Sequence, residues 1–224
     1  MGLNKSNGNM YEWITHTWNP LGGACLHDCS YCSTHKLMRY PGIMNKYSGP
    51  VRLIEHELKT NLGTGNFIFV CAQQDLFAEG VPEEYIKAIL DHCDKFDNQY
   101  LFQTKNPAGV RRILPEKSVV CVTVESNRHY PEIMRNSPEP IHRLDEMVKI
   151  RRPLYITIEP VIDFDLEEFV DFIEQCKPIQ VNIGADSGHN NLPEPPKEKL
   201  LELIHRLEGF TTVKQKSNLQ RLLK

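Results

Sequence analysis

The stretch GGACLHDCSYCSTH (residues 22–35) places Cys25, Cys29 and Cys32 within eight positions. The two glycines before the cysteines let the backbone turn tightly around a bound group. Three thiolates at this spacing can all face one centre, which predicts a metal site. A structural zinc site usually takes its ligands from two separated pairs and so ties two pieces of chain together. Because these cysteines share one short loop, they favour a centre that keeps a coordination position open.

Other interpretations of the cysteines stay open. His27 or His35 could complete a Cys3His zinc site, and plain buried thiols are a third interpretation. The chain has seven cysteines, an odd number that suits a disulfide framework poorly and favours metal ligation in a reducing compartment. The four cysteines outside the loop are interpreted as small buried hydrophobic residues: Cys71, Cys93, Cys121 and Cys176.

The composition is that of an ordinary globular protein, with 40% hydrophobic and 25% charged residues among 224. The formal net charge is −3, so the chain as a whole has no excess of positive charge of the kind that indicates nucleic-acid binding. Two basic stretches, residues 128–135 and 142–152, are interpreted as solvated helix faces. The chain has no apolar run of about 18 residues, and its N-terminus lacks the apolar core of a secretory signal. We therefore expect a cytoplasmic protein without a membrane partner, with one domain over residues 1–224.

Apolar runs alternate with helical patterns along the chain. The runs that predict buried strands cover residues 67–71, 100–104, 118–124, 154–159 and 179–184, with weaker runs at 12–18 and 211–215. Apolar stripes that predict helices cover residues 54–62, 85–93, 144–148, 166–173 and 200–207. This alternation predicts an α/β fold with mostly parallel strands. Six or seven units are too few for a full eight-fold barrel, so we expect a partial (β/α)6-type barrel, with a doubly wound open sheet as the alternative.

Polar and charged residues follow the predicted strands. They are Gln73, Gln74, Asp75, Lys105, Glu125, Ser126, Asn127, Glu159, Asp186, Ser187, His189 and Lys216. Both candidate folds place their sites at the carboxyl ends of the strands, so these side chains are expected to meet there. Glu159 stands out because it lies between YITI and PVI, where a carboxylate is costly unless it is paired or used.

The spacing C-x3-C-x-aromatic-C, with Tyr31 in the aromatic place, resembles the signature of the radical S-adenosylmethionine (radical SAM) superfamily. Further stretches resemble the strand-end motifs of a small radical-SAM-like family associated with phages and prokaryotes. They are THTWNPLGGAC, IFVCAQQDLFAEGVP, FQTKNP, VTVESN, TIEPVI and IGADSG, spread over residues 12–216. The chain departs from that family at Cys-Ala-Gln-Gln before Asp75, where small residues are usual, and at Asp186, where glutamate is common.

The resemblance implies a radical SAM fold and a 4Fe-4S cluster held by Cys25, Cys29 and Cys32. Three cysteines leave one iron free to chelate S-adenosylmethionine. An electron from an external donor of the flavodoxin or ferredoxin type then cleaves the cofactor to a 5′-deoxyadenosyl radical. That radical abstracts hydrogen from a substrate that the sequence does not identify. The phage association favours a nucleotide or nucleic acid that is modified or repaired.

Roles for the remaining residues follow from charge, within that resemblance. Tyr31 is expected near the adenine of the cofactor. The methionyl ammonium is assigned to Gln73, Gln74 and Asp75, with Asp75 as the carboxylate. The cofactor carboxylate is assigned to Lys105 or Ser126, and the ribose hydroxyls to Glu125 and Asn127. The residues left to face the substrate are Glu159, Asp186, His189 and Lys216, and the candidate catalytic residues are Glu159, Lys105 and Asp186.

Two alternatives to a radical SAM enzyme are kept. One is a zinc-stabilised (β/α) metal-binding protein or hydrolase, and the other is an iron–sulfur redox sensor that never cleaves S-adenosylmethionine. After reconstitution with iron and sulfide a radical SAM enzyme should be brown, whereas a zinc protein would stay colourless. Production of 5′-deoxyadenosine distinguishes the enzyme from a redox sensor, which would form none.

Overall fold

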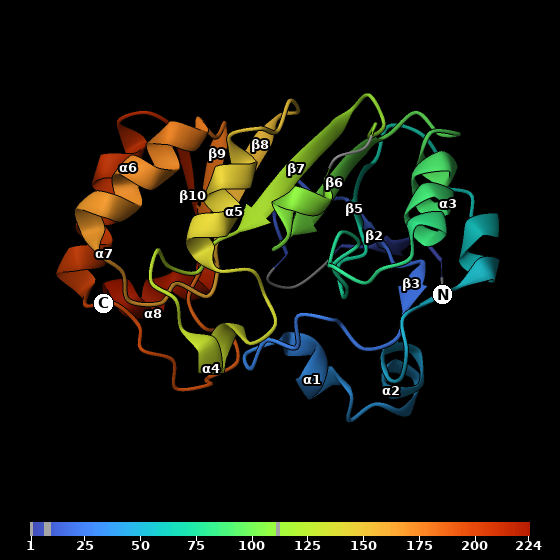
Figure 1. The fold of residues 1–224 in the computed structure, drawn as a ribbon, viewed down its shortest axis with the longest axis horizontal. Coiled ribbons are helices and arrows are strands. Elements are labelled where there is room, and N and C mark those ends of the chain that lie inside the picture. Colours follow the sequence, from blue (N-terminus) through green and yellow to red (C-terminus); the bar gives the residue numbers. More distant parts are fainter. Residues whose placement is uncertain (1, 7–9, 111–112) are drawn as a thin grey trace.

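The structure, a computed structural model, describes residues 2–6, 10–110 and 113–224. Its main feature is an eight-stranded sheet in the order β1-β2-β5-β6-β7-β8-β9-β10 (Figure 1). The strands are β1 (Asn4–Lys5), β2 (His16–Trp18), β5 (Phe67–Val70), β6 (Gln99–Thr104), β7 (Ser118–Thr123), β8 (Leu154–Ile158), β9 (Gln180–Ile183) and β10 (Thr212–Gln215). A separate antiparallel pair consists of β3 (Leu21–Gly22) and β4 (Arg52–Leu53).

All neighbouring strands from β2 to β10 are parallel, and only β1 is antiparallel to its neighbour. The strands lie side by side in chain order, so the direction of winding never reverses as it does in a doubly wound sheet. β1 and β10 are the two edges, and the sheet is not closed. The prediction of a mostly parallel, partial barrel is confirmed, and the doubly wound alternative is wrong.

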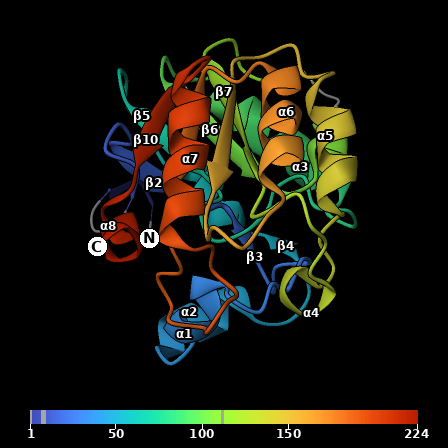
Figure 2. The ribbon, with the colours of Figure 1, turned by 90° about the vertical axis from the view of Figure 1, so that its left-hand side faces the viewer.

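The helices that connect the strands cover one face of the sheet (Figure 2). The longer ones are α3 (Glu83–Cys93), α5 (Pro140–Met147), α6 (Leu166–Cys176) and α7 (Lys197–Glu208). The shorter elements are α1 (Ser33–Leu37), α2 (Pro41–Tyr47), α4 (Pro131–Met134), α8 (Gln220–Leu223) and the 3-10 helices η1 (Glu55–Lys59), η2 (Pro107–Gly109) and η3 (Ser217–Leu219). In α6, Phe169, Val170 and Ile173 lie on the buried side, as their spacing predicts.

The two faces of the sheet have separate cores because side chains alternate along a strand. In β7, Val120 and Val122 face the helices, whereas Cys121 faces the concave side. The concave core is completed by the segment before β2, through Tyr11 and Ile14. This explains why the strand predicted over residues 12–18 covers only His16–Trp18: the preceding residues fold into the open barrel instead.

One predicted helix is wrong. Residues 54–62 form no α-helix, and only Glu55–Lys59 are helical, as a 3-10 turn. Glu57 in that turn is buried and its carboxylate lies 3.4 Å from the ammonium of Lys46, so a polar residue occupies the inward side. Several short elements were not predicted, because segments of two to seven residues carry little periodicity. They are the strands β1, β3 and β4 and the helices α1 and α2.

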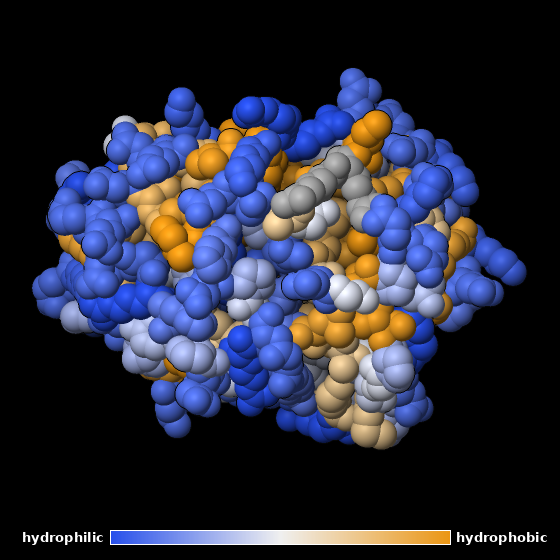
Figure 3. All heavy atoms as spheres, in the orientation of Figure 1, coloured by the Kyte–Doolittle hydropathy of each residue, from blue (hydrophilic) through white to orange (hydrophobic). Residues whose placement is uncertain are grey.

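The visible surface is mainly hydrophilic in the view of Figure 3, with apolar side chains gathered at its lower right, where α2 lies in Figure 1. Tyr40, which directly precedes α2, and Met44, which lies within it, are among the exposed large apolar residues. Within the described ranges, no helix combines the length and apolar character needed to cross a bilayer.

Candidate functional site

The carboxyl ends of the strands meet at a cavity of about 460 Å³. All three cysteines of the loop over residues 23–32, which we call the cysteine loop, line this cavity. The register explains why distant residues converge, since Thr123 pairs with Thr157 and Ile158 with Ile183, which puts the strand ends level. Predicted residues that line the cavity are Tyr31, Gln73, Gln74, Asp75, Lys105, Glu159, Asp186, Ser187 and Lys216. Four predicted residues are not among its lining residues: Glu125, Ser126, Asn127 and His189.

The tight turn expected before the cysteines occurs at Gly23, whose φ is +95°. A Cβ at this position would lie 2.3 Å from the carbonyl oxygen of Pro50. The glycine therefore allows the cysteine loop to lie directly against the segment that enters β4.

The three thiols of the loop are free, with Cys29 buried and Cys25 and Cys32 half-buried. Burial, followed by the negative charge of Asp75, raises the pKa of Cys25 to about 11. A metal centre that binds this sulfur must therefore displace its proton. Among the described residues, no three His, Cys, Asp or Glu side chains converge as ligands of a single metal ion. Thiolates that bind separate irons of one iron–sulfur cluster need not converge on a single point.

The two histidines proposed as a fourth zinc ligand are engaged elsewhere. His27 Nε2 lies 2.7 Å from Asp75 Oδ2, and His35 Nε2 lies 3.2 Å from Asp28 Oδ1. The donor set of the cysteine loop therefore fits an iron–sulfur cluster with three cysteine ligands better than a Cys3His zinc site.

Residues 131–137, which we call the α4 clamp, hold the cysteine loop from outside. The backbone N–H of Ser30 donates to the carbonyl of Ile133 at 3.0 Å, and that of Asn136 donates to the carbonyl of His27 at 3.2 Å. Cys29 Sγ lies 3.3 Å from Ser137 Oγ. A thiolate can only accept, so if Cys29 bound a metal in that form, the Ser137 hydroxyl would donate to the sulfur.

An ion pair between two residues with positive φ joins the α4 clamp to the cysteine loop. Arg135 (φ 47°) and Asp28 (φ 49°) adopt a backbone conformation that favours glycine. The Arg135 guanidinium donates to the Asp28 carboxylate at 2.6 Å, which ties the clamp to the cysteine loop. The interpretation of residues 128–135 as a solvated face missed this contact, because nothing in the local pattern links residues 107 positions apart.

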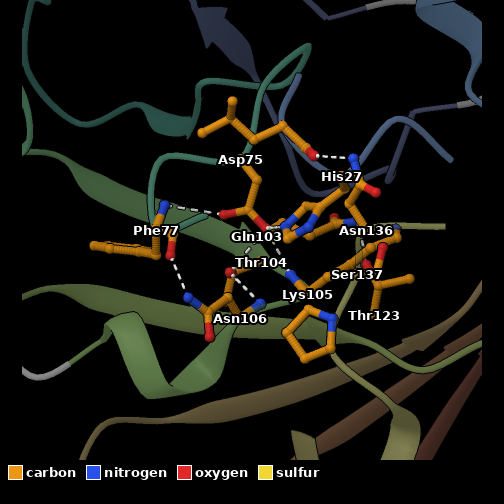
Figure 4. Close-up of polar contacts among 12 residues, drawn as sticks. His27, Asp75, Phe77, Gln103, Thr104, Lys105, Asn106, Thr123, Asn136 and Ser137 are labelled. Atoms are coloured by element: carbon orange, nitrogen blue, oxygen red, sulfur yellow. Dashed lines mark hydrogen bonds and ion pairs between the residues drawn. The ribbon is translucent and has the colours of Figure 1, made fainter. Parts of the chain in front are cut away.

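Asp75 connects the cysteine loop to the ends of β5 and β6 (Figure 4). Its Oδ2 accepts from Thr104 Oγ1 at 2.9 Å and from the backbone N–H of Lys105 at 2.7 Å, in addition to the contact with His27. Its Oδ1 accepts from the backbone N–H of Phe77 at 2.9 Å. Burial raises the pKa of Asp75, but His27 and the hydrogen bonds outweigh it, so the pKa lies below its ordinary value.

We expect Asp75→Asn to destabilise the protein by about 2–3 kcal/mol, because an amide nitrogen at the Oδ2 position would face two donors that it cannot satisfy. Iron–sulfur incorporation should fall as well, since His27 loses its anchor. Urea unfolding and iron content per chain measure the two effects. Asp94→Asn, at the end of α3, is the matched control and should change both by little. Equal stability and iron content in Asp75→Asn and the control would contradict this role.

A second buried network lies behind the cavity and centres on Glu125, which is fully buried. Glu125 Oε2 accepts from Arg143 Nη1 at 2.7 Å, and Oε1 lies 3.4 Å from Lys105 Nζ. Tyr31 of the cysteine loop donates its hydroxyl to Glu125 Oε1. Burial raises the pKa of Glu125, but the two cations and Tyr31 outweigh it and lower the pKa to about 2.

The interpretation of residues 142–152 as a solvated face is wrong at Arg143. Its side chain is completely buried, and besides Glu125 it donates to the carbonyls of Thr123 and Pro138, each at 2.7 Å. Its Nη2 has no hydrogen-bond partner among the described residues. Glu125 with Arg143 therefore positions Tyr31 and Lys105, and Glu125 itself does not reach the cavity.

The other residues after β7 stabilise a neighbouring loop. Ser126 Oγ donates to the carbonyl of Asp163 at 2.7 Å, and Asn127 exchanges hydrogen bonds with the backbone of Asp165. The structure therefore does not bring Ser126 and Asn127 to the place where a cofactor carboxylate or ribose was expected.

The wall of the cavity beyond β8 carries a second ion pair. Glu159 Oε2 lies 2.8 Å from Lys216 Nζ, and this ammonium lies 4.7 Å from the ring centre of Tyr11. Asp186 accepts from the backbone N–H of Gly188 at 2.9 Å and from the side chain of Asn190 at 2.6 Å, so it orders its own loop. Tyr11 was not predicted as a lining residue, because its position depends on the folding of the N-terminal segment into the barrel.

The remaining predicted residues after β5 are also engaged. Gln73 Oε1 accepts from Thr34 Oγ1 at 2.7 Å, and Gln74 donates to the carbonyl of Gly23. Both contacts join the end of β5 to the segment that carries the cysteines.

A family model described as "Protein of unknown function (DUF5131)" matches residues 9–197. Comparison with curated proteins finds no match. Among solved structures, a mutant of spore photoproduct lyase with dinucleoside spore photoproduct is similar, with a TM-score of 0.63, 10% identity, and coverage of 96% of this chain and 80% of that chain. Another mutant of that lyase, with bound AdoMet and dinucleoside spore photoproduct, gives a TM-score of 0.64 at the same identity and coverage. At this identity the likeness shows the fold alone, which is radical SAM-like with an open barrel.

Proposed function

The chain belongs to the DUF5131 family, and we propose that it is a radical SAM enzyme that acts on a nucleotide or nucleic acid. The observation that supports this most is the placement of the cysteine motif. Cys25, Cys29 and Cys32 all line the cavity at the strand ends, on a radical SAM-like fold.

Cys25, Cys29 and Cys32 would hold a 4Fe-4S cluster, with the α4 clamp fixing the loop from outside. When bound, the cluster and S-adenosylmethionine supply a 5′-deoxyadenosyl radical that can abstract hydrogen. An external electron donor of the flavodoxin or ferredoxin type is part of this proposal. Apolar side chains in the cavity lining, such as Met10 and Phe69, help to exclude water from the reacting groups.

Several residues of the cavity would bind the cofactor. Lys105 carries a positive charge at the cavity wall, and its ammonium lies 5.4 Å from the ring centre of Tyr31, which supports our assignment of the cofactor carboxylate to it. Asp75 Oδ1 accepts one hydrogen bond and keeps acceptor capacity for an ammonium group. Neither Glu125 nor Asn127 lines the cavity, so the ribose hydroxyls are not assigned to them.

A nucleotide-type substrate is supported by the similar structures that hold a dinucleoside, which shows that this fold can accommodate one in another protein. The lining also contains Glu159, Lys216 and Asp186 beyond the residues that we assign to the cofactor. These three remain our candidates to face the substrate.

The experiment that tests the proposal is reconstitution of the protein with iron and sulfide in the absence of oxygen. We expect a brown protein that, after reduction, converts S-adenosylmethionine to 5′-deoxyadenosine, measured by chromatography. A colourless protein with stoichiometric zinc would overturn the proposal. A brown protein that never forms 5′-deoxyadenosine would identify it as an iron–sulfur sensor instead.

A further inference from the structure

Glu159 and Lys216 form an ion pair inside the cavity. Glu159 directly follows β8 and Lys216 directly follows β10, whereas the last strand of this sheet before the cysteine loop is β2, near the opposite edge. Both side chains line the cavity, with exposed fractions of 18% and 12%. The pair is therefore accessible from the cavity, in contrast to the fully buried pair of Glu125 and Arg143.

The surrounding residues hold this ion pair in place. A Cβ at Gly184 would lie 2.8 Å from the carboxyl carbon of Glu159, so the absence of a side chain there lets the carboxylate lie against β9. Asn218 Nδ2 lies 3.3 Å from Glu159 Oε1, and the Lys216 ammonium is positioned above the Tyr11 ring. Two charged groups held in this way present a fixed pattern to a ligand.

That pattern is an acceptor directly beside a donor. A carboxylate has about four acceptor sites and an ammonium has three N–H groups, so the contacts with Lys216 and Asn218 do not use up the acceptor sites of Glu159, and one contact with Glu159 does not use up the N–H groups of Lys216. The complementary ligand has an N–H donor beside an acceptor, and it needs no net charge. On one side of the pair the lining is aromatic, since Tyr11 lies under the Lys216 ammonium and its ring is stacked with that of Phe69. This surface suits a flat ring better than a small zwitterion.

We infer that Glu159 and Lys216 bind the base-pairing edge of a nucleobase, an inference that rests on the proposed function. Glu159 accepts the ring N–H, and Lys216 donates to the adjacent carbonyl oxygen, as found together in thymine, uracil and guanine. In a duplex this edge is already used for pairing. The substrate is therefore an unpaired base, which belongs to a free nucleoside, a single strand or a nucleotide turned out of a helix.

The test measures binding of thymidine and of 3-methylthymidine, which lacks the ring N–H, by calorimetry on the reconstituted protein with S-adenosylmethionine. We expect 3-methylthymidine to bind at least about tenfold more weakly than thymidine, as for the loss of a paired contact to a base edge. This comparison uses the unaltered protein, so it does not depend on whether a variant folds.

Lys216→Met should weaken thymidine binding by a similar factor. Lys214→Met is the matched control, because Lys214 is exposed on the preceding strand and does not line the cavity. It should bind thymidine as the unaltered protein does.

Any of four results would overturn the inference. Thymidine and 3-methylthymidine could bind equally, or Lys216→Met could bind thymidine as the unaltered protein does. Neither nucleoside could bind, or alanine could bind in place of thymidine. Iron content and 5′-deoxyadenosine formation are recorded on the same samples. If both are normal and thymidine does not bind, only this inference fails. If both are missing, the proposed function fails.

Discussion

Cys29→Ala is expected to lose its iron–sulfur cluster and to form no detectable 5′-deoxyadenosine. Cys29 is the most buried of the three loop cysteines, and its sulfur lies between the carbonyl of Met134 and the hydroxyl of Ser137. The remaining four cysteines lie outside the cysteine loop, and among them Cys71, in the turn after β5, is the one that lines the cavity. With only two thiolates left in the loop, the site lacks the ligands to hold the cluster at three corners. Iron and sulfide content, visible absorbance and cofactor cleavage measure the effect.

Cys176→Ala is the control for this substitution. Cys176 is buried on α6 and does not line the cavity. Its replacement should cost about 1 kcal/mol of stability through lost packing and leave iron content unchanged. Full iron content and cofactor cleavage in Cys29→Ala would show that the assignment of the ligands is wrong.

Arg143→Met is expected to destabilise the protein by about 3 kcal/mol, the largest effect that we expect from a residue outside the cavity. Removing one member of a buried ion pair leaves the other charge uncompensated in the interior. Of the charged and hydroxyl groups described above, Glu125 would keep Lys105 at 3.4 Å and the Tyr31 hydroxyl. Lys105 and Tyr31 would then be held less firmly, so the affinity for S-adenosylmethionine should fall too. Urea unfolding and equilibrium binding of the cofactor measure the two effects.

The double variant Arg143→Met with Glu125→Gln distinguishes loss of charge balance from loss of packing. Because it removes the uncompensated carboxylate as well, it should be more stable than Arg143→Met alone. Arg151→Met, at an exposed position after α5, is the surface control and should change stability by less than about 0.5 kcal/mol. An effect of Arg143→Met as small as that of Arg151→Met would contradict the importance of the buried network.

The sequence alone determined the fold class and the cysteine motif. Strands and longer helices are read from periodicities within about ten residues, and the C-x3-C-x-aromatic-C spacing lies within one loop. The polar residues at the strand ends were also predicted to meet, and most of them line the cavity, because parallel strands bring their carboxyl ends to one edge. The predictions failed for the segment over residues 54–62, where a buried carboxylate interrupts the apolar stripe.

Only the tertiary structure decided which of these residues face the cavity and which lie behind it. His27 and Asp75 are 48 positions apart, and Tyr31 and Glu125 are 94 apart. Arg143 reads as one basic residue in a charged stretch, yet it is completely buried. Contacts of this kind depend on the order of strands in the sheet and on the path of each connection over it. Local spacing specifies which helices and strands form. Ion pairs between residues far apart in the sequence form only when packing buries both partners together.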